Sequence, residues 1–244
     1  MGKRRTKIVW MVACSVVLCI IAAWYGTGRY VLSSNADKIW QWQCDTLHGT
    51  PSDAGCYCVE VFVKADGNLM VMRANDSTDI VPIESYFRFL RDCPKGKLWI
   101  RLHNLTEDNM TAFVDSLGHL GGRYQLRESQ FILESSNWST LGMLTKYRFC
   151  VAVPLVADDP SHLTEQQKDS VITRLDRVVG SGRITAIDMP RGWYGMLRHQ
   201  YKHRDIRFFV RVPDTSPRSI ILSPAMLCLL NNPQVRGIVE EQYE

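Results

Sequence analysis

The chain has 244 residues, of which 45% are hydrophobic and 22% charged, and its formal net charge is +4. This length supports one sizeable hydrophobic core, and the composition excludes an intrinsically disordered protein. Part of the small positive excess is concentrated at the N-terminus, so the rest of the chain is close to neutral. We therefore expect one globular domain without a nucleic-acid partner.

The N-terminus has the pattern of a membrane anchor. Lys3, Arg4, Arg5 and Lys7 directly precede an uncharged apolar run, Ile8–Tyr25. This run is close to the lower length limit for a helix that spans a bilayer. Because positively charged flanks stay in the cytoplasm, the pattern predicts a single-pass protein with its N-terminus inside. The rest of the chain is then periplasmic or extracellular, and the lipid bilayer is its first predicted partner.

A cleaved signal peptide is the alternative to an anchor. Cleavage needs small residues at the processing site, and Ala22 and Ala23 are followed by Trp24 and Tyr25. Two adjacent aromatic residues are more typical of the interfacial belt of a membrane helix. We expect an uncleaved anchor, and cleavage stays open as the second interpretation.

Beyond the anchor, apolar runs typical of strands alternate with helical patterns. The expected strands are Lys38–Gln43, Tyr57–Val63, Leu69–Met72, Leu98–His103, Gln130–Glu134, Phe149–Leu155, Ile184–Asp188, Ile206–Val212 and Val235–Glu240. The expected helices are Pro82–Arg91, Glu107–Leu120, Asn137–Thr145, Leu163–Val179, Gly192–His203 and Ser219–Leu230. Asp66-Gly67 predicts a hairpin after the second strand, so the third run is an accessory strand. Eight β units remain, which predicts an α/β fold of the (β/α)8 TIM-type barrel class.

The expected organisation is therefore a cytoplasmic stub (1–7), a transmembrane anchor (8–26), a linker (27–37) and one barrel domain (38–244). Within the second strand, period-two alternation places the valines of Val59–Val63 toward the helix layer. Cys58, Glu60 and Phe62 then face the barrel lumen. Barrel enzymes use such lumenal strand ends for chemistry, although Glu60 could instead be neutralised by a neighbouring cation.

Several segments together carry a resemblance to a known family. They are Ile39–Asp45, Val59–Phe62, Asp66-Gly67, Val71–Arg73, Trp99–Leu105, Phe131–Ser135 and Val235–Val239. In order and spacing they resemble the glycerophosphodiester phosphodiesterase-like barrels, a PLC-like phosphodiesterase family, and most of all their menorin branch. The resemblance implies the barrel fold over nearly the whole outer domain.

The enzymes of this family hold a divalent cation with three carboxylates, and this sequence departs from that pattern. Glu60 keeps one carboxylate, while Phe62 and Arg101 stand at the other two positions. A hard cation needs several oxygen ligands, and a fixed guanidinium repels it. The resemblance therefore implies no metal and no other cofactor, with Glu60, Phe62 and Arg101 as a vestigial site.

The proton-transfer positions are also altered. Trp42 and Arg73 stand where the family has its two histidines, Gln43 replaces an arginine, and His103 replaces a lysine. Losing one acid–base group typically lowers the rate about 100- to 10,000-fold. The matched positions thus predict a catalytically inactive barrel, a pseudoenzyme.

Binding is the function that these substitutions leave. The candidate binding residues form a cationic, aromatic-lined set: Glu60, Arg73, Trp99, Arg101, His103 and Glu134, with Trp42 beside them. Such a set suits an anionic or lipid-like ligand. The alternative is that these side chains only fill the lumen with paired charges and packed rings.

Two further functions stay open. A metal-independent phosphodiester hydrolase or lyase would use an arginine in place of the metal, with His103 and His48 as its acid and base. A structural subunit of an envelope complex would bind a protein partner through an exposed apolar patch on its helix layer.

Overall fold

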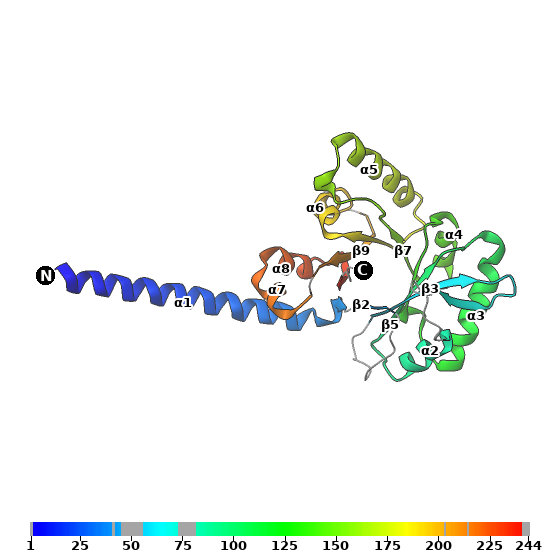
Figure 1. Cartoon of the computed structure of the whole chain (residues 1–244), viewed down its shortest axis with the longest axis horizontal. Coiled ribbons are helices and arrows are strands. Elements are labelled where there is room, and N and C mark those ends of the chain that lie inside the picture. Colours follow the sequence, from blue (N-terminus) through cyan, green and yellow to red (C-terminus); the bar gives the residue numbers. More distant parts are fainter. Residues whose placement is uncertain are drawn as a thin grey trace.

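The computed structural model describes residues 2–40, 42–44, 56–72, 82–202, 204–213 and 215–240. The chain opens with a long helix, α1 (Gly2–Ser34), which leads through a short 3-10 turn, η1 (Ala36–Lys38), into an α/β domain (Figure 1). The strands are β1 (Ile39–Trp40), β2 (Trp42–Cys44), β3 (Cys56–Val63), β4 (Leu69–Met72), β5 (Lys97–Leu102), β6 (Phe131–Glu134), β7 (Cys150–Pro154), β8 (Ala186–Pro190), β9 (Arg207–Val212) and β10 (Val235–Glu240). The helices of the domain are α2 (Ile83–Arg91), α3 (Glu107–Tyr124), α4 (Trp138–Met143), α5 (Glu165–Gly180), α6 (Arg191–Gln200), α7 (Pro217–Leu222) and α8 (Pro224–Asn231).

The strands form one curled sheet. Its order is β1-β10-β9-β8-β7-β6-β5-β3-β2, every neighbouring pair in this order is parallel, and β4 pairs antiparallel with β3 beside it. β1 ends at Trp40 and β2 begins at Trp42, so the first and last strands of the order come from one short stretch of chain. Counted as one, they give eight parallel β units. The predicted α/β class, the eight units and the accessory hairpin strand are confirmed.

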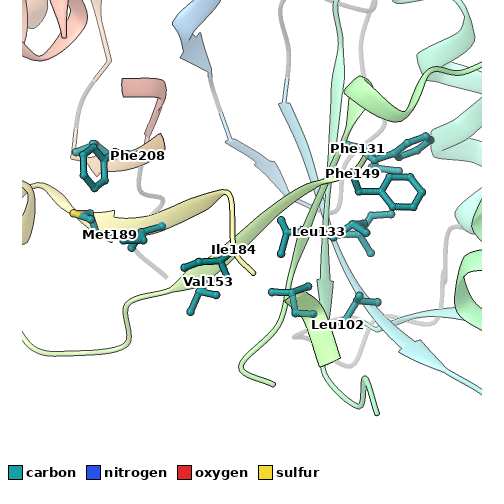
Figure 2. Packing of buried hydrophobic residues seen from close by; sticks show 14 of the residues in the cluster. Leu102, Phe131, Leu133, Phe149, Val153, Ile184, Met189 and Phe208 are labelled. Atoms are coloured by element: carbon teal, nitrogen blue, oxygen red, sulfur yellow. The ribbon is translucent and has the colours of Figure 1, made fainter. Parts of the chain in front are cut away.

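Two apolar layers lie on the two faces of this sheet. The outer layer packs strands against helices and includes Val59, Val61 and Val63. Figure 2 shows part of it, with Phe131 and Phe149 close together. The inner layer fills the lumen and consists of Cys56, Cys58, Trp99, Ile132, Ala152, Ala186, Phe209 and Val239. The predicted alternation along β3 is therefore confirmed, and the lower lumen is a packed core, as in other barrels of this type.

Helix α3 is longer than expected. It was expected to end at Leu120, before Gly121-Gly122, but it continues to Tyr124 and ends where Gln125 adopts a left-handed conformation (φ 57°). Gly121 is buried over the ring of Phe131, and a Cβ added there would lie 3.8 Å from that ring. Gly121 is thus compatible with close helix–sheet packing, Gly122 is exposed, and the helix is capped by Gln125 directly after Tyr124.

The last predicted helix is two helices. Residues 219–230 were expected to form one, whereas α7 ends at Leu222 and α8 starts at Pro224. Ser223 caps α8, since its side chain accepts a hydrogen bond from the Met226 amide, and Pro224 occupies the first helical position. A proline is favoured there because that position has no intrahelical N–H bond to lose.

The N-terminal segment also differs from the expected division. Helix α1 does not end near residue 26 but continues to Ser34, so most of the expected linker (27–37) is helical. Its last turns pack on α7 and α8, which buries Gly28 and Val31. Apolar side chains between Val16 and Ile21 are more than half exposed, and Cys14–Ser34 is long and apolar enough to cross a membrane.

Candidate functional site

Charged side chains gather at the C-terminal ends of the parallel strands. Glu60 on β3, Arg101 on β5 and Glu134 on β6 lie side by side in register. Arg211 is the next-to-last residue of β9, and it pairs with Asp188 in the middle of β8. We call the following set the lumen cluster: Glu60, Arg101, His103, Glu134, Asp188 and Arg211.

Arg101 lies between two carboxylates. Its Nη1 is 3.8 Å from Glu60 Oε1, and its Nε is 3.3 Å from Glu134 Oε1. On the other side of Glu60, His103 Nε2 is 3.2 Å from Oε2. Glu60 thus has a neighbouring cation, as its alternative interpretation in the sequence expected, and this cation lies on the adjacent strand β5. The guanidinium thus occupies the space between carboxylates in which a bound cation would compensate their charge.

Glu134 and Trp99 form the deeper level of the cluster. The Trp99 indole Nε1 donates a 2.6 Å hydrogen bond to Glu134 Oε2, and its ring packs edge-on against Phe209 at 4.8 Å. Burial, together with the negative charge of Asp188, raises the pKa of Glu134 to about 7, although Arg101, Trp99 and Arg211 oppose this. Trp99 is fully buried, so its contribution is to hold Glu134 in place beneath the mouth.

The lumen holds a second ion pair that was not predicted from the sequence. Arg211 Nε lies 3.3 Å from Asp188 Oδ2, and only 1% of the Asp188 side chain is exposed. The sequence did contain a signal for both residues, because each is a charge near the C-terminal end of a predicted apolar strand. Asp188 is the last residue of the predicted strand Ile184–Asp188, and Arg211 is the next to last of Ile206–Val212.

The remaining residues predicted for the site contribute no charged group to the lumen cluster or have side chains that the structure does not describe. Phe62 follows Glu60 on the lumenal side of β3 and is 38% exposed, with no atom that could ligate a cation. Trp42 and Gln43 belong to β2, and the structure describes their backbone alone. Arg73 and His48 lie outside the described residues. Within the described part of the chain, no group of three His, Cys, Asp or Glu side chains could hold a metal ion.

The lumen cluster therefore has two levels above the apolar floor. Glu134 and Asp188 are buried, whereas Glu60, Arg101, His103 and Arg211 are between one-fifth and one-half exposed. Both arginines reach down to a buried carboxylate through Nε. The mouth thus offers two guanidinium groups and an imidazole, which are the donor types that recognise anionic groups.

Comparisons with known proteins agree with this architecture. No family model and no curated protein matches the chain in sequence. Among solved structures, it is similar to a protein from Agrobacterium tumefaciens assigned as a glycerophosphoryl diester phosphodiesterase. That match has a TM-score of 0.57 and 13% identity, and it covers 83% of this chain and 92% of that one.

A second solved structure is a glycerophosphodiester phosphodiesterase from Parabacteroides distasonis. The TM-score is 0.50 at 12% identity, with 84% of this chain and 92% of that one covered. At such identities the likeness concerns the fold and leaves the activity open. The chain has the PLC-like barrel fold of the glycerophosphodiester phosphodiesterases.

Proposed function

We propose that the chain is a membrane-anchored, extracytoplasmic phosphodiesterase-like barrel that binds an anionic or lipid-like ligand, or a protein partner, without hydrolysing phosphodiesters. The observation that carries this proposal is the position of Arg101 between Glu60 and Glu134. A divalent cation at this place would meet a fixed positive charge, and the carboxylates it needs are already paired. Arg101, Arg211 and His103 support binding of an anionic group at the mouth.

The first experiment measures the response of the full-length protein to metal. Calcium or magnesium at millimolar concentration should leave the melting temperature of the parent unchanged. A Phe62→Asp/Arg101→Asp variant supplies two carboxylates beside Glu60 and should be stabilised. Occupation at ten times Kd contributes about 1.4 kcal/mol, equivalent to a shift of roughly 3–6 °C in a protein of this size.

The matched control is Phe62→Asn/Arg101→Asn, which has nearly the same side-chain shapes without the two charges. Its melting temperature should not respond to metal. A parent that calcium stabilises, or a control that responds as strongly as the aspartate variant, contradicts the proposal.

A metal-independent phosphodiesterase is the second candidate. It is favoured by the contact between His103 and Glu60, because a carboxylate can orient an imidazole as an acid or base, and by the arginine in the metal position. Turnover of glycerophosphodiesters that is insensitive to chelator and lost in both His103→Gln and Glu60→Gln would establish it. The binding proposal expects no turnover in the parent or in either variant.

The anchor is tested separately. Protease added to spheroplasts or intact cells should digest the barrel domain while α1 remains with the membrane. Sequencing the mature N-terminus decides between the two interpretations of the first helix. A mature protein that begins after Ala23 removes the anchor but leaves the outer location of the barrel.

A further inference from the structure

Helix α1 and the η1 turn that follows it contact the α7–α8 unit (Pro217–Asn231) directly. From α1, the Trp24 indole Nε1 donates a 3.0 Å hydrogen bond to the carbonyl oxygen of Ile221 in the last turn of α7. From η1, Lys38 Nζ donates to the carbonyl oxygens of Leu230 (3.0 Å) and Asn232 (3.4 Å), where α8 ends. A cation is favourable at those carbonyls because they lack intrahelical partners.

Glycine makes the close approach of α1 to α7 possible. A Cβ added at Gly28 would lie 2.8 Å from the Ile221 side chain and 3.4 Å from its Cα. A Cβ at Gly26, half a turn earlier, would have nothing within 4 Å. A larger side chain at position 28 would therefore move the helices apart. A larger side chain at position 26 would not.

These contacts fix the depth of α7 once α1 crosses a bilayer. Ile8 to Trp24 covers about 25 Å of helix, close to the roughly 30 Å thickness of the hydrocarbon layer. Trp24 therefore lies where the helix leaves the apolar layer, which is the level that tryptophan prefers. Since the Ile221 carbonyl is bonded to this tryptophan, α7 must lie at the same level, at the lipid headgroups.

The exposed side chains near Trp24 and α7 are of the types that contact lipid headgroups. Arg29 follows Trp24 by about 7.5 Å along the helix, is exposed, and lies over the ring of Tyr25 at 5.9 Å. Arg218 is exposed at the start of α7, and α8 begins with the exposed, uncharged pair Pro224 and Ala225. Exposed cations on α1 and α7, together with small uncharged residues at the start of α8, match the phosphates and glycerol region of a phospholipid layer.

We infer that the α7–α8 unit is a lipid-headgroup contact surface that α1 holds against the bilayer. The barrel then has a fixed orientation relative to its membrane. The inference rests on the proposed anchor and goes beyond it, because a flexible linker would leave the domain free to turn.

Photo-crosslinking of the full-length protein in phospholipid nanodiscs tests the surface. One phospholipid carries a diazirine in its acyl chain, and a second carries it in its headgroup. The acyl probe should label α1 between Cys14 and Ala23, and the headgroup probe should label Pro217–Asn231. Acyl labelling of α1 without headgroup labelling of α7–α8 overturns the inference while the anchor stands. Absence of acyl labelling removes the anchor and the inference with it.

Two glycine variants test whether α1 is responsible for this position. Gly28→Leu should lose headgroup labelling of Pro217–Asn231 and keep acyl labelling of α1. The matched control, Gly26→Leu, should retain both. Circular dichroism checks that the domain of each variant is folded. Equal headgroup labelling in folded Gly28→Leu and Gly26→Leu would show that α1 does not hold the surface in place.

Discussion

Replacing Arg211 by methionine is expected to destabilise the domain by about 3–5 kcal/mol, the usual cost of leaving one charge of a buried pair without its partner. Asp188 is 1% exposed, lies 3.3 Å from Arg211 Nε, and carries a charge that also acts on Glu134. Removing the guanidinium also removes the positive charge that compensates the repulsion between the buried carboxylates of Asp188 and Glu134. Chemical denaturation of the full-length protein at pH 7.5 measures the loss.

The same strand supplies the control. Arg207 forms an ion pair of 3.9 Å with Asp205 in which Arg207 is half-exposed and Asp205 almost fully exposed, so Arg207→Met should cost no more than about 1 kcal/mol. Adding Asp188→Asn to Arg211→Met removes the unpaired charge and should recover much of the stability. If the two single arginine variants lose equal stability, Asp188 does not depend on Arg211.

Most of the architecture could be predicted because each signal was local. Alternating side chains marked the two faces of β3, and Asp66-Gly67 marked the turn that makes β4 an accessory strand. The errors occurred where a local signal competed with packing. The predicted helix stopped before the glycine pair in α3, but the helix continues through it, and Gly121 packs over Phe131. The length of α1 was underestimated because its last turns are stabilised by α7 and α8, which follow almost 200 residues later in the chain.

Part of the candidate site was also predictable from local sequence signals. Glu60 and Arg101 lie on strands that the resemblance had aligned, so both could be named as lumenal candidates and a cation could be expected beside Glu60. Asp188 and Arg211 come from the last third of the chain, where no matched motif directed attention to them. Their pairing depends on the register of β8 and β9, which the sequence does not specify. The burial of Trp99 likewise depends on residues from the opposite side of the lumen.

A second large effect is expected from pH. The pKa of Glu134 is raised to about 7, first by burial and then by Asp188, whereas in the unfolded chain it lies near 4.5. Between pH 4.5 and about pH 7 the folded protein retains a proton that the unfolded chain has released. The free energy of unfolding therefore falls as pH rises through this range. A difference of about 2.5 pK units corresponds to roughly 3 kcal/mol. Below pH 4.5 both states are protonated, and above pH 7 the full cost of the buried charge is present.

Glu134→Gln isolates this contribution, because glutamine keeps an acceptor for the Trp99 indole and cannot ionise. The free energy of unfolding of the parent, minus that of the variant, should decrease by roughly 3 kcal/mol from pH 4.5 to 7.5. Taking this difference removes the contributions of groups that the substitution does not affect. Asp188, Arg101 and Arg211 also face Glu134, and both arginines stay charged throughout the range. A difference that is flat with pH would mean that folding leaves the pKa of Glu134 unchanged, and one that grows as pH rises would mean that Arg101 outweighs the cost of burial and lowers that pKa.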